Sequence, residues 1–362
     1  MSVDAYLNPA ARRWRTDRSP DALGFHASLP GYAPTRLVEL PGIARELGVA
    51  RVFVKEEASR LRLPAFKILG ASYAVSRALT ERVGGSGALP VDELRERLRT
   101  TGPVRLVAAT DGNHGRAVAH MARLLGIPAR IYTPADITPE AKAGIESEGA
   151  NRIEVDAPYD DVVAEAAESA GDADVLIQDT SWEGYERIPQ WIVEGYTTLV
   201  VEADQQLSEV GARAEVVVVP VGVGSLAEAV VRHYRSGGTA PTVLSVEPTA
   251  APTLRESLRA GRPVTVEASS TIMAGLNCGT PTAGGWPTLH RGIDAAVTVT
   301  DAATARAVHD LEALGVDAGP CGAATLAGIR SLAEVAPLAP EATVLLLSTE
   351  SRAANPLPTD LS

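Results

Sequence analysis

Runs of apolar and β-branched residues alternate with helical patterns along most of this 362-residue chain, and this alternation limits the folds open to it. Several runs, such as "AEVVVVPVG" at 214–222, are apolar throughout, which is typical of strands covered on both faces. Segments between them, such as "GRAVAHMARLLG" at 115–126, repeat apolar residues with the spacing of a helix. The alternation predicts an α/β protein with mainly parallel, doubly wound sheets.

Nine strands are predicted, which is more than one ordinary sheet holds, so we expect two three-layer α/β domains. The predicted strands lie at 51–57, 104–110, 129–134, 151–155, 174–180, 214–222, 242–248, 295–300 and 343–348. In open α/β sheets, ligands bind at the carboxyl ends of the strands, where loops lead into helices. We therefore expect the functional residues in those loops.

The charge pattern argues against several classes of partner. The formal net charge is -12 at pH 7, with acidic and basic residues interspersed, so neither nucleic acid nor an anionic membrane is expected to bind. No signal-like segment is visible, and no run approaches the roughly 20 apolar residues of a membrane span, so we expect a cytoplasmic protein. Cys278 and Cys321 have no ligand-like neighbours, which predicts reduced thiols and no metal site.

Lysine is rare in this chain. Of the 33 lysines and arginines, only Lys55, Lys67 and Lys142 are lysines. Arginine supplies positive charge equally well, but it neither loses its proton at ordinary pH nor forms an imine. Lys67 lies in "LPAFKILGASYA", between Phe66 and Ile68, and these apolar neighbours are expected to disfavour its charged form. It is therefore a candidate carbonyl-binding amine; the alternatives are a lysine whose stem covers apolar surface and a buried ion pair.

A second candidate loop follows the strand predicted at 104–110. In "TDGNHGRAVA" the strand ends at Thr110, and Asp111, Asn113 and His114 lie at the turn into a helix, where backbone amides can also approach a ligand. The alternative is an Asx turn that only caps the helix. The small-residue stretch "GASYA", with Ser72, offers a further hydroxyl to an anion.

A third loop joins a buried strand to a helix in "VVVVPVGVGSLAEAVV". Gly222, Gly224 and Ser225 place free backbone amides and a hydroxyl at a helix N-terminus, which is a typical phosphate site. The same letters fit a dinucleotide fingerprint with Glu247 as its acidic residue, which would indicate a nicotinamide-dependent oxidoreductase. Both interpretations make the turn an anion site.

Six separated segments together resemble one enzyme family. In chain order they are "LPAFKILGASYA", "TDGNHGRAVA", "QDTSWEGYERIPQWIVEGYTTL", "VVVPVGVGSLAEA", "TIMAGLNCGTPT" and "LLLSTE". This set resembles the diaminopropionate ammonia-lyases, which are tryptophan-synthase-β-like (fold type II) pyridoxal-phosphate enzymes, over nearly the whole chain. The resemblance implies pyridoxal 5'-phosphate as cofactor, a homodimer, a large domain of 1–71 with 181–362, a small domain of 72–180, and an active site in the cleft between them.

The resemblance also implies roles around the cofactor. Lys67 corresponds to the lysine that holds the cofactor as a Schiff base and moves the Cα proton, and Asn113 corresponds to the asparagine that binds the pyridoxal 3'-oxygen. Ser348 falls where the family places a hydroxyl against the ring nitrogen, which favours loss of a β-substituent over transamination. The residues expected around the cofactor are Phe66, Lys67, Asn113, Gly222, Val223, Gly224, Ser225, Ser348 and Thr349.

Two carboxylates complete the implied site. Asp111 and Asp179 resemble the family's catalytic pair with Lys67, and an acid at Asp111 suits a substrate that carries a second ammonium at Cβ. For Asp179 the alternative is a helix N-cap. The implied reaction is the α,β-elimination of 2,3-diaminopropionate to pyruvate and ammonia. The residues expected around this small-molecule substrate are Ser72, Thr110, Asp111, Gly112, His114 and Asp179.

The chain also departs from the family pattern. Ser351 stands where the family commonly has a glycine, and the segment 84–103 is short. These differences leave a serine or threonine dehydratase, or a β-replacement enzyme of specialised metabolism, as alternative functions. A sensor that binds the cofactor or an amino acid without turnover is a further alternative.

Overall fold

The structure, a computed structural model, describes residues 5–18, 20–237, 240–358 and 361. The chain divides into two compact units. The large unit consists of Met1–Pro20, Pro34–Ser59 and Leu199–Ser362, and the small unit consists of Asp21–Ala33 and Arg60–Thr198. Each unit has its own sheet and its own buried core, as the sequence predicts.

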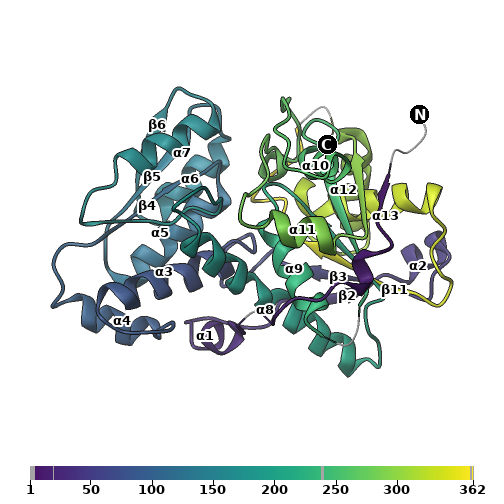
Figure 1. Cartoon of the computed structure of the whole chain (residues 1–362), viewed down its shortest axis with the longest axis horizontal. Coiled ribbons are helices and arrows are strands. Elements are labelled where there is room, and N and C mark those ends of the chain that lie inside the picture. Colours follow the sequence, from purple (N-terminus) through teal and green to yellow (C-terminus); the bar gives the residue numbers. More distant parts are fainter. Residues whose placement is uncertain (1–4, 19, 238–239, 359–360, 362) are drawn as a thin grey trace. The chain divides into compact units, whose positions relative to one another are not determined.

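The large unit is built around a seven-stranded sheet in the order β1-β10-β9-β8-β11-β3-β2 (Figure 1). The inner strands are parallel, and the two edge strands β1 and β2 are antiparallel to their neighbours. The strands are β1 (Tyr6–Leu7), β2 (Leu37–Glu39), β3 (Arg51–Glu56), β8 (Val216–Pro220), β9 (Thr242–Pro248), β10 (Ala295–Val299) and β11 (Thr343–Ser348).

Helices cover both faces of this sheet. Every residue of β8 is buried. Val216 and Val218 belong to one apolar cluster with residues of α12 and α13, while α9 packs against β8 and β9 from the other side. The helices of the large unit are η1 (Ala11–Arg13), α2 (Pro41–Leu47), α9 (Ser225–Arg235), α10 (Thr253–Ala260), η2 (Ala274–Leu276), α11 (Trp286–Gly292), α12 (Asp301–Ala313) and α13 (Pro320–Val335).

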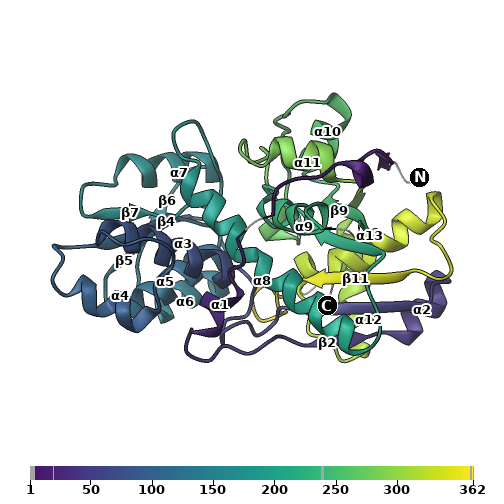
Figure 2. The same cartoon turned by 60° about the horizontal axis from the view of Figure 1, so that its bottom comes forward.

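The small unit contains a four-stranded parallel sheet in the order β6-β5-β4-β7. Helix α7 packs on one side of β4 and β5, and α5, backed by α3, packs on the other (Figures 1 and 2). Its strands are β4 (Arg105–Ala109), β5 (Ala129–Pro134), β6 (Asn151–Val155) and β7 (Asp174–Leu176). Its helices are α1 (Leu23–Ala27), α3 (Ile68–Arg82), α4 (Val91–Leu98), α5 (Asn113–Leu125), α6 (Pro139–Ser147), α7 (Tyr159–Glu168) and the first half of α8 (Arg187–Glu209).

The nine predicted strands are all confirmed, whereas β1 and β2 were not predicted, because segments this short show no periodicity. The units have different bounds from the predicted domains. Residues 21–33, 60–71 and 181–198 group with the smaller sheet, since α1 packs on α3, α3 packs on α5, and the first half of α8 packs on α3. The predicted cleft between domains stays a prediction.

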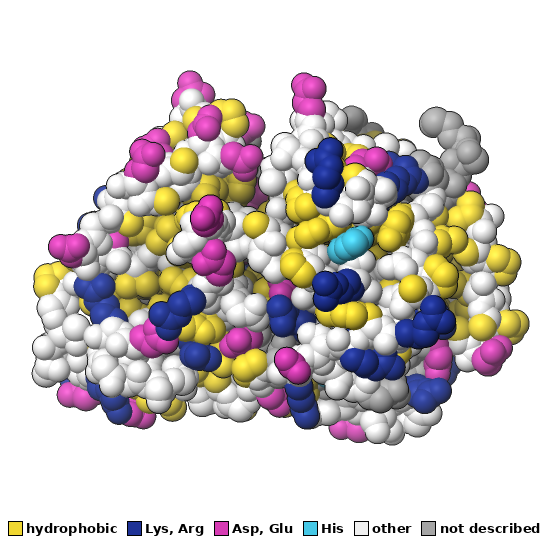
Figure 3. All heavy atoms as spheres, viewed as in Figure 1, with side chains coloured by type: hydrophobic (Ala, Val, Ile, Leu, Met, Phe, Trp, Pro, Cys, Tyr) yellow, Lys and Arg dark blue, Asp and Glu magenta, His cyan; other side chains and the backbone are white. Residues whose placement is uncertain are grey.

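The distribution of surface charge and the length of the helices bear on whether nucleic acid or a membrane could bind. On the face shown in Figure 3, basic and acidic side chains are interspersed. Among the residues that the structure describes, no helix combines the length and apolar character needed to cross a membrane.

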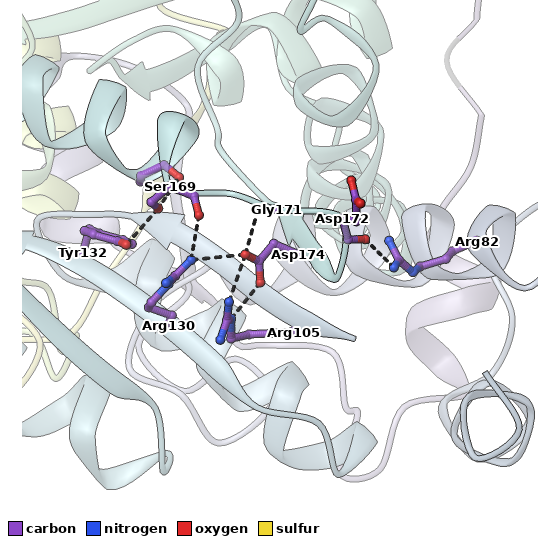
Figure 4. Close-up of polar contacts among 9 residues, drawn as sticks. Arg82, Arg105, Arg130, Tyr132, Ser169, Gly171, Asp172 and Asp174 are labelled. Atoms are coloured by element: carbon purple, nitrogen blue, oxygen red, sulfur yellow. Dashed lines mark hydrogen bonds and ion pairs between the residues drawn. The ribbon is translucent and has the colours of Figure 1, made fainter. Parts of the chain in front are cut away.

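An arginine cluster joins the amino ends of three strands in the small unit (Figure 4). Asp174, at the start of β7, accepts hydrogen bonds from Nε of Arg105 at 2.7 Å, Nη2 of Arg130 at 3.1 Å and the amide of Gly171 at 3.0 Å. Its side chain is 2% exposed. Burial would raise the pKa of this carboxyl group, but its hydrogen bonds and the two arginines lower it below the ordinary value.

We predict that Asp174→Ala lowers the free energy of unfolding by about 2 kcal/mol, because charge-assisted hydrogen bonds to both arginines are lost. A lowered pKa stabilises the fold above the unfolded-state pKa of about 4 and ceases to do so as the pH falls further, so the difference between variant and parent should shrink in acid. Thermal unfolding followed by circular dichroism at pH 7 and pH 3 measures both effects.

Asp172→Ala is the matched control for this prediction. Arg82 contacts only the backbone carbonyl of Asp172, so removing the side chain should leave stability unchanged. An equal loss of stability in both variants would show that the carboxylate of Asp174 does not provide the stabilising contacts.

Candidate active site

Lys67 and Asp179 form an ion pair in the small unit. Lys67 immediately precedes α3, and its Nζ donates to Oδ2 of Asp179 over 2.6 Å. The side chains of Lys67 and Asp179 are 22% and 7% exposed, so the pair is largely shielded from water. The predicted ion-pair alternative for Lys67 is therefore present in this structure.

The two groups determine each other's protonation. Burial favours the neutral amine, but the carboxylate of Asp179 outweighs it, and the pKa of Lys67 lies above its ordinary value. The expectation that apolar neighbours alone would disfavour the charged form is wrong, because the sequence could not reveal the carboxylate that Lys67 meets. Burial likewise opposes ionisation of Asp179, and the Lys67 ammonium overcomes it and lowers the pKa of Asp179 to about 2.

Asp179 is held by an irregular segment that follows β7. The hydroxyl of Tyr185 donates to the carbonyl of Leu176 at 2.7 Å and accepts from the amide of Gln178 at 3.0 Å. The side-chain oxygen of Gln178 accepts from the amide of Ala109, which ties the segment to the end of β4. No helix begins near Asp179 in this part of the described chain, so the N-cap alternative is wrong.

The turn after β4 forms a second part of the same site. Thr110 is buried, and its Oγ1 accepts from the amides of Gly112 at 2.9 Å and Gly115 at 3.0 Å, which fixes the turn before α5. Asn113 is the first residue of α5. Asp111 is exposed on this turn and interacts electrostatically with both Lys67 and Asp179.

His114 lies behind the ion pair. Its Nε2 is 2.8 Å from the carbonyl of Ile177, which can only accept, so Nε2 carries the proton. Its Nδ1 is 3.9 Å from Oδ2 of Asp179. Burial lowers the pKa of His114, so the ring is neutral and presents a lone pair on Nδ1.

The predicted phosphate turn lies in the large unit. It follows β8, and Gly224, with a φ of 109°, adopts the left-handed conformation just before Ser225 begins α9. Gly224 has no side chain to cap this helix, so it does not compete with an anion for the amides of the first turn. A Cβ at Gly222 would lie 2.9 Å from the carbonyl oxygen of Gly275, so only glycine fits there.

Ser348 ends β11 in the same unit. The pairing of Leu346 with Val218 brings Ser348 to the edge of the sheet from which the Gly222–Ser225 turn departs. Its hydroxyl is buried and has no hydrogen-bond partner among the described groups. A Cβ at Gly322 would lie 2.6 Å from this Oγ, so the N-terminus of α13 approaches it closely.

The segment after Ser348 accommodates the departure from the family pattern. Thr349 is buried, and Oε1 of Glu350 accepts from the amide of Cys321 at 3.2 Å. Ser351 has no left-handed backbone conformation, so this position does not require the usual glycine.

These features fit pyridoxal phosphate. An amine beside carboxylates can bind its carbonyl group, a helix N-terminus with glycine turns can bind its phosphate, and an unpartnered buried hydroxyl can meet its ring nitrogen. The dinucleotide alternative is weakened by the contacts of Glu247. Its two carboxylate oxygens accept hydrogen bonds from the amides of Leu254 and Arg255, so both are already engaged within the chain rather than with a ribose hydroxyl.

The predicted residues fall into two groups. The small unit contains Phe66, Lys67, Thr110, Asp111, Gly112, Asn113, His114 and Asp179, and the large unit contains Gly222, Val223, Gly224, Ser225, Ser348 and Thr349. Ser72 is fully buried and its hydroxyl donates to the carbonyl of Leu69, so it is used within its own helix. Sequence reasoning missed Gln178, Tyr185 and Tyr196. All three lie in the quoted segment that begins at Gln178, but nothing in the sequence distinguishes them from structural residues.

Comparison with known proteins gives concordant results. A family model described as "Pyridoxal-phosphate dependent enzyme" matches residues 29–350. A diaminopropionate ammonia-lyase from Salmonella typhimurium is 34% identical over 91% of this chain and 88% of its own length. The crystal structure of diaminopropionate ammonia-lyase from Escherichia coli in complex with D-serine has a TM-score of 0.87 at 31% identity, covering 97% of this chain and 95% of that one. The same Escherichia coli protein with an aminoacrylate–PLP azomethine intermediate has a TM-score of 0.85 at 30% identity, with the same coverage.

We predict that Asp179→Asn lowers the pKa of Lys67, because the charge that offsets burial is removed while burial remains. The measurement is the pH dependence of Lys67 acetylation by trace acetic anhydride in the cofactor-free full chain, quantified by peptide mass spectrometry. Lys142, on α6, is the internal reference.

Asp111→Asn is the matched comparison. Asp111 acts on Lys67 from a longer distance than Asp179 does, so its variant should shift the acetylation profile less. Equal shifts in the two variants, or no shift in Asp179→Asn, would contradict the assigned ion pair.

Proposed function

Since the chain belongs to the pyridoxal-phosphate-dependent enzymes and, among them, to the diaminopropionate ammonia-lyase family, we propose that it eliminates ammonia from 2,3-diaminopropionate. With uptake of one water, the products are pyruvate and two molecules of ammonia. The observation that carries the proposal is that the amine of Lys67 forms an ion pair with Asp179 and also interacts with Asp111. This arrangement places a nucleophile and two carboxylates together.

We propose that Lys67 holds the cofactor through Nζ, that Asn113 binds the 3'-oxygen, that Gly222–Ser225 binds the phosphate, and that Ser348 meets the ring nitrogen. When bound, pyridoxal phosphate supplies a carbonyl group for the substrate amine and a ring that stabilises negative charge at Cα. The proposal requires the residues of both units to form one active site. It is supported by the N-terminus of α9, where Gly224 provides no side-chain cap, and by the unpartnered hydroxyl of Ser348.

Asp179 is proposed as a base for the Cα proton. Its low pKa depends on the positive charge of Lys67. When Nζ no longer carries that charge, burial dominates and favours the protonated carboxyl group, so Asp179 gains affinity for a proton. The charge state of Lys67 therefore controls when Asp179 can accept one.

Asp111 is proposed to bind the second ammonium of the substrate. Asp111 is an exposed residue of the turn fixed by Thr110, but burial of its carboxyl group raises the pKa above the ordinary value, so an ammonium bound beside it would favour the carboxylate. A protonated amine is a better leaving group than a neutral one, and a neighbouring carboxylate favours the protonated form. Asp111 can also serve as a second base at Cα.

The alternative that keeps the cofactor is a dehydratase that acts on serine or threonine. The structure of the Escherichia coli relative with D-serine shows that a hydroxyl amino acid binds that protein. Pyruvate release from 2,3-diaminopropionate and serine, compared with 2-oxobutyrate release from threonine, decides between the two. Greater turnover of serine or threonine than of diaminopropionate would reject the proposal.

We predict that the purified protein shows a visible absorption band from bound pyridoxal phosphate and that Lys67→Ala lacks it, because Nζ is the proposed point of attachment. The variant should also lose pyruvate release. Lys142→Ala is the control and should keep both properties, since Lys142 pairs with Glu154 on the surface. A band that survives Lys67→Ala would reject the assignment of the attachment residue.

We predict that Asp111→Asn lowers kcat/KM for diaminopropionate by about 100-fold, the size expected for losing a charge-assisted contact in the transition state. The loss for serine should be smaller, because serine has no second ammonium. The measurement is coupled pyruvate release from both substrates. Equal losses would show that Asp111 does not recognise the substrate charge.

We also propose that the enzyme acts in the cytoplasm as a homodimer. Cys278 and Cys321 are not joined in a disulfide, which is compatible with a reducing compartment. The homodimer rests on the family resemblance alone.

A further inference from the structure

Tyr196 is a buried residue of the small unit that the proposed mechanism does not use. It lies on α8 and is completely shielded from water. Lys67 is its nearest charged partner: the ammonium interacts with the phenol electrostatically and as a hydrogen-bond neighbour, although no described group lies in full hydrogen-bonding geometry with the hydroxyl. A buried hydroxyl without a partner is costly, which calls for a reason to keep it there.

The position of the ring is closely fixed. A Cβ at Gly70 would lie 2.6 Å from Cε1 of Tyr196, so the ring lies against the first turn of α3, directly after Lys67. A Cβ at Gly195 would lie 2.5 Å from the carbonyl oxygen of Leu69, so both helices need glycine where they cross. The ring of Phe66 packs on Tyr196 with centroids 4.7 Å apart. The hydroxyl therefore has little freedom to seek another partner.

The hydroxyl of Tyr196 would gain an acceptor if Lys67 lost its proton. While Lys67 is an ammonium, its Nζ donates to Asp179, and the phenol can only accept from it, because a hydroxyl cannot donate to an ammonium. Once Lys67 is neutral, Nζ has a lone pair, and Asp179 can donate to it only while it keeps the proton; as soon as Asp179 passes that proton on, it has none to give. The titratable groups that act on Lys67 are Asp179, Asp111 and Tyr196, with His114 behind Asp179. Among them, the phenol is the O–H donor that does not depend on a proton taken from Lys67, since burial raises the pKa of Tyr196.

We propose that Tyr196 is a positioning residue for Lys67: its hydroxyl donates a hydrogen bond to the neutral Nζ and orients the amine when it acts as nucleophile and base. Asp179 and Tyr196 thus hold the same nitrogen in its two protonation states. This inference rests on the proposed role of Lys67 in cofactor attachment.

The test is Tyr196→Phe, which removes one oxygen atom and keeps the ring. Cofactor is added to the cofactor-free full chain, and the rate at which the visible absorption band returns is measured as a function of pH. We expect a rate about tenfold lower than that of the parent at neutral pH, the usual effect of one lost hydrogen bond. The pH midpoint should move upward, because the neutral amine loses its donor while the ammonium keeps Asp179.

Thermal stability separates this role from a structural one. Because no described group lies in full hydrogen-bonding geometry with the hydroxyl, its removal should leave the Tm of the cofactor-free chain nearly unchanged or raise it. Tyr132→Phe is the matched control, since its hydroxyl donates to Ser169 at 2.8 Å, near the arginine cluster (Figure 4). It should lower the Tm and leave the rate and its pH profile unchanged.

Two results would overturn the inference. One is a rate and pH profile of Tyr196→Phe that match the parent. The other is a lower Tm together with a rate loss that is the same at every pH, which would show that the hydroxyl only supports packing. Lys67→Ala distinguishes these failures from failure of the proposed function: if that variant still forms the absorption band, Lys67 is not the attachment residue and the function itself is wrong.

Discussion

The ion pair between Lys67 and Asp179 is the interaction on which the rest of the site depends. Neither group has its ordinary proton affinity, and burial makes each charge costly unless the other is present. The small unit positions both partners: Lys67 at the start of α3, and Asp179 on a segment that Tyr185 and Gln178 fasten to β7 and β4. A pair coupled in this way can transfer protons, because loss of the positive charge on Lys67 makes Asp179 a better base.

Parallel strands explain why the other candidate groups occur where they do. Asp111 follows β4 and Asp179 follows β7, which are neighbours in one sheet. The Gly222–Ser225 turn follows β8 and Ser348 ends β11, which are neighbours in the other. Because the carboxyl ends of parallel strands lie at the same edge, each sheet gathers groups that are distant in sequence. Helices bury the faces of both sheets, so in each sheet the candidate functional groups lie at the edge formed by the carboxyl ends of the strands.

The sequence revealed strands and loops better than it revealed contacts. Continuous apolar runs such as β8 predict buried parallel strands because both faces are covered, and this is a local property. The rarity of lysine singled out Lys67 before any contact was known. Its raised pKa could not be predicted, because Asp179 lies more than a hundred residues away and burial alone has the opposite sign. Ser72 was misjudged for a related reason: a serine in a helix often satisfies its hydroxyl on the preceding turn.

Tyr196 shows which kind of functional residue a single sequence conceals. A tyrosine in an apolar helix reads as a core residue, and here its ring is one. What distinguishes it is the crossing of α3 and α8, where Gly70 and Gly195 let a phenol approach the turn that carries Lys67. A carboxylate can only accept hydrogen bonds, whereas a phenol can donate to a lone pair, so the two are complementary rather than redundant partners for an amine that gains and loses a proton. An amine held by an ionised Asp179 alone would be well ordered only in its unreactive state.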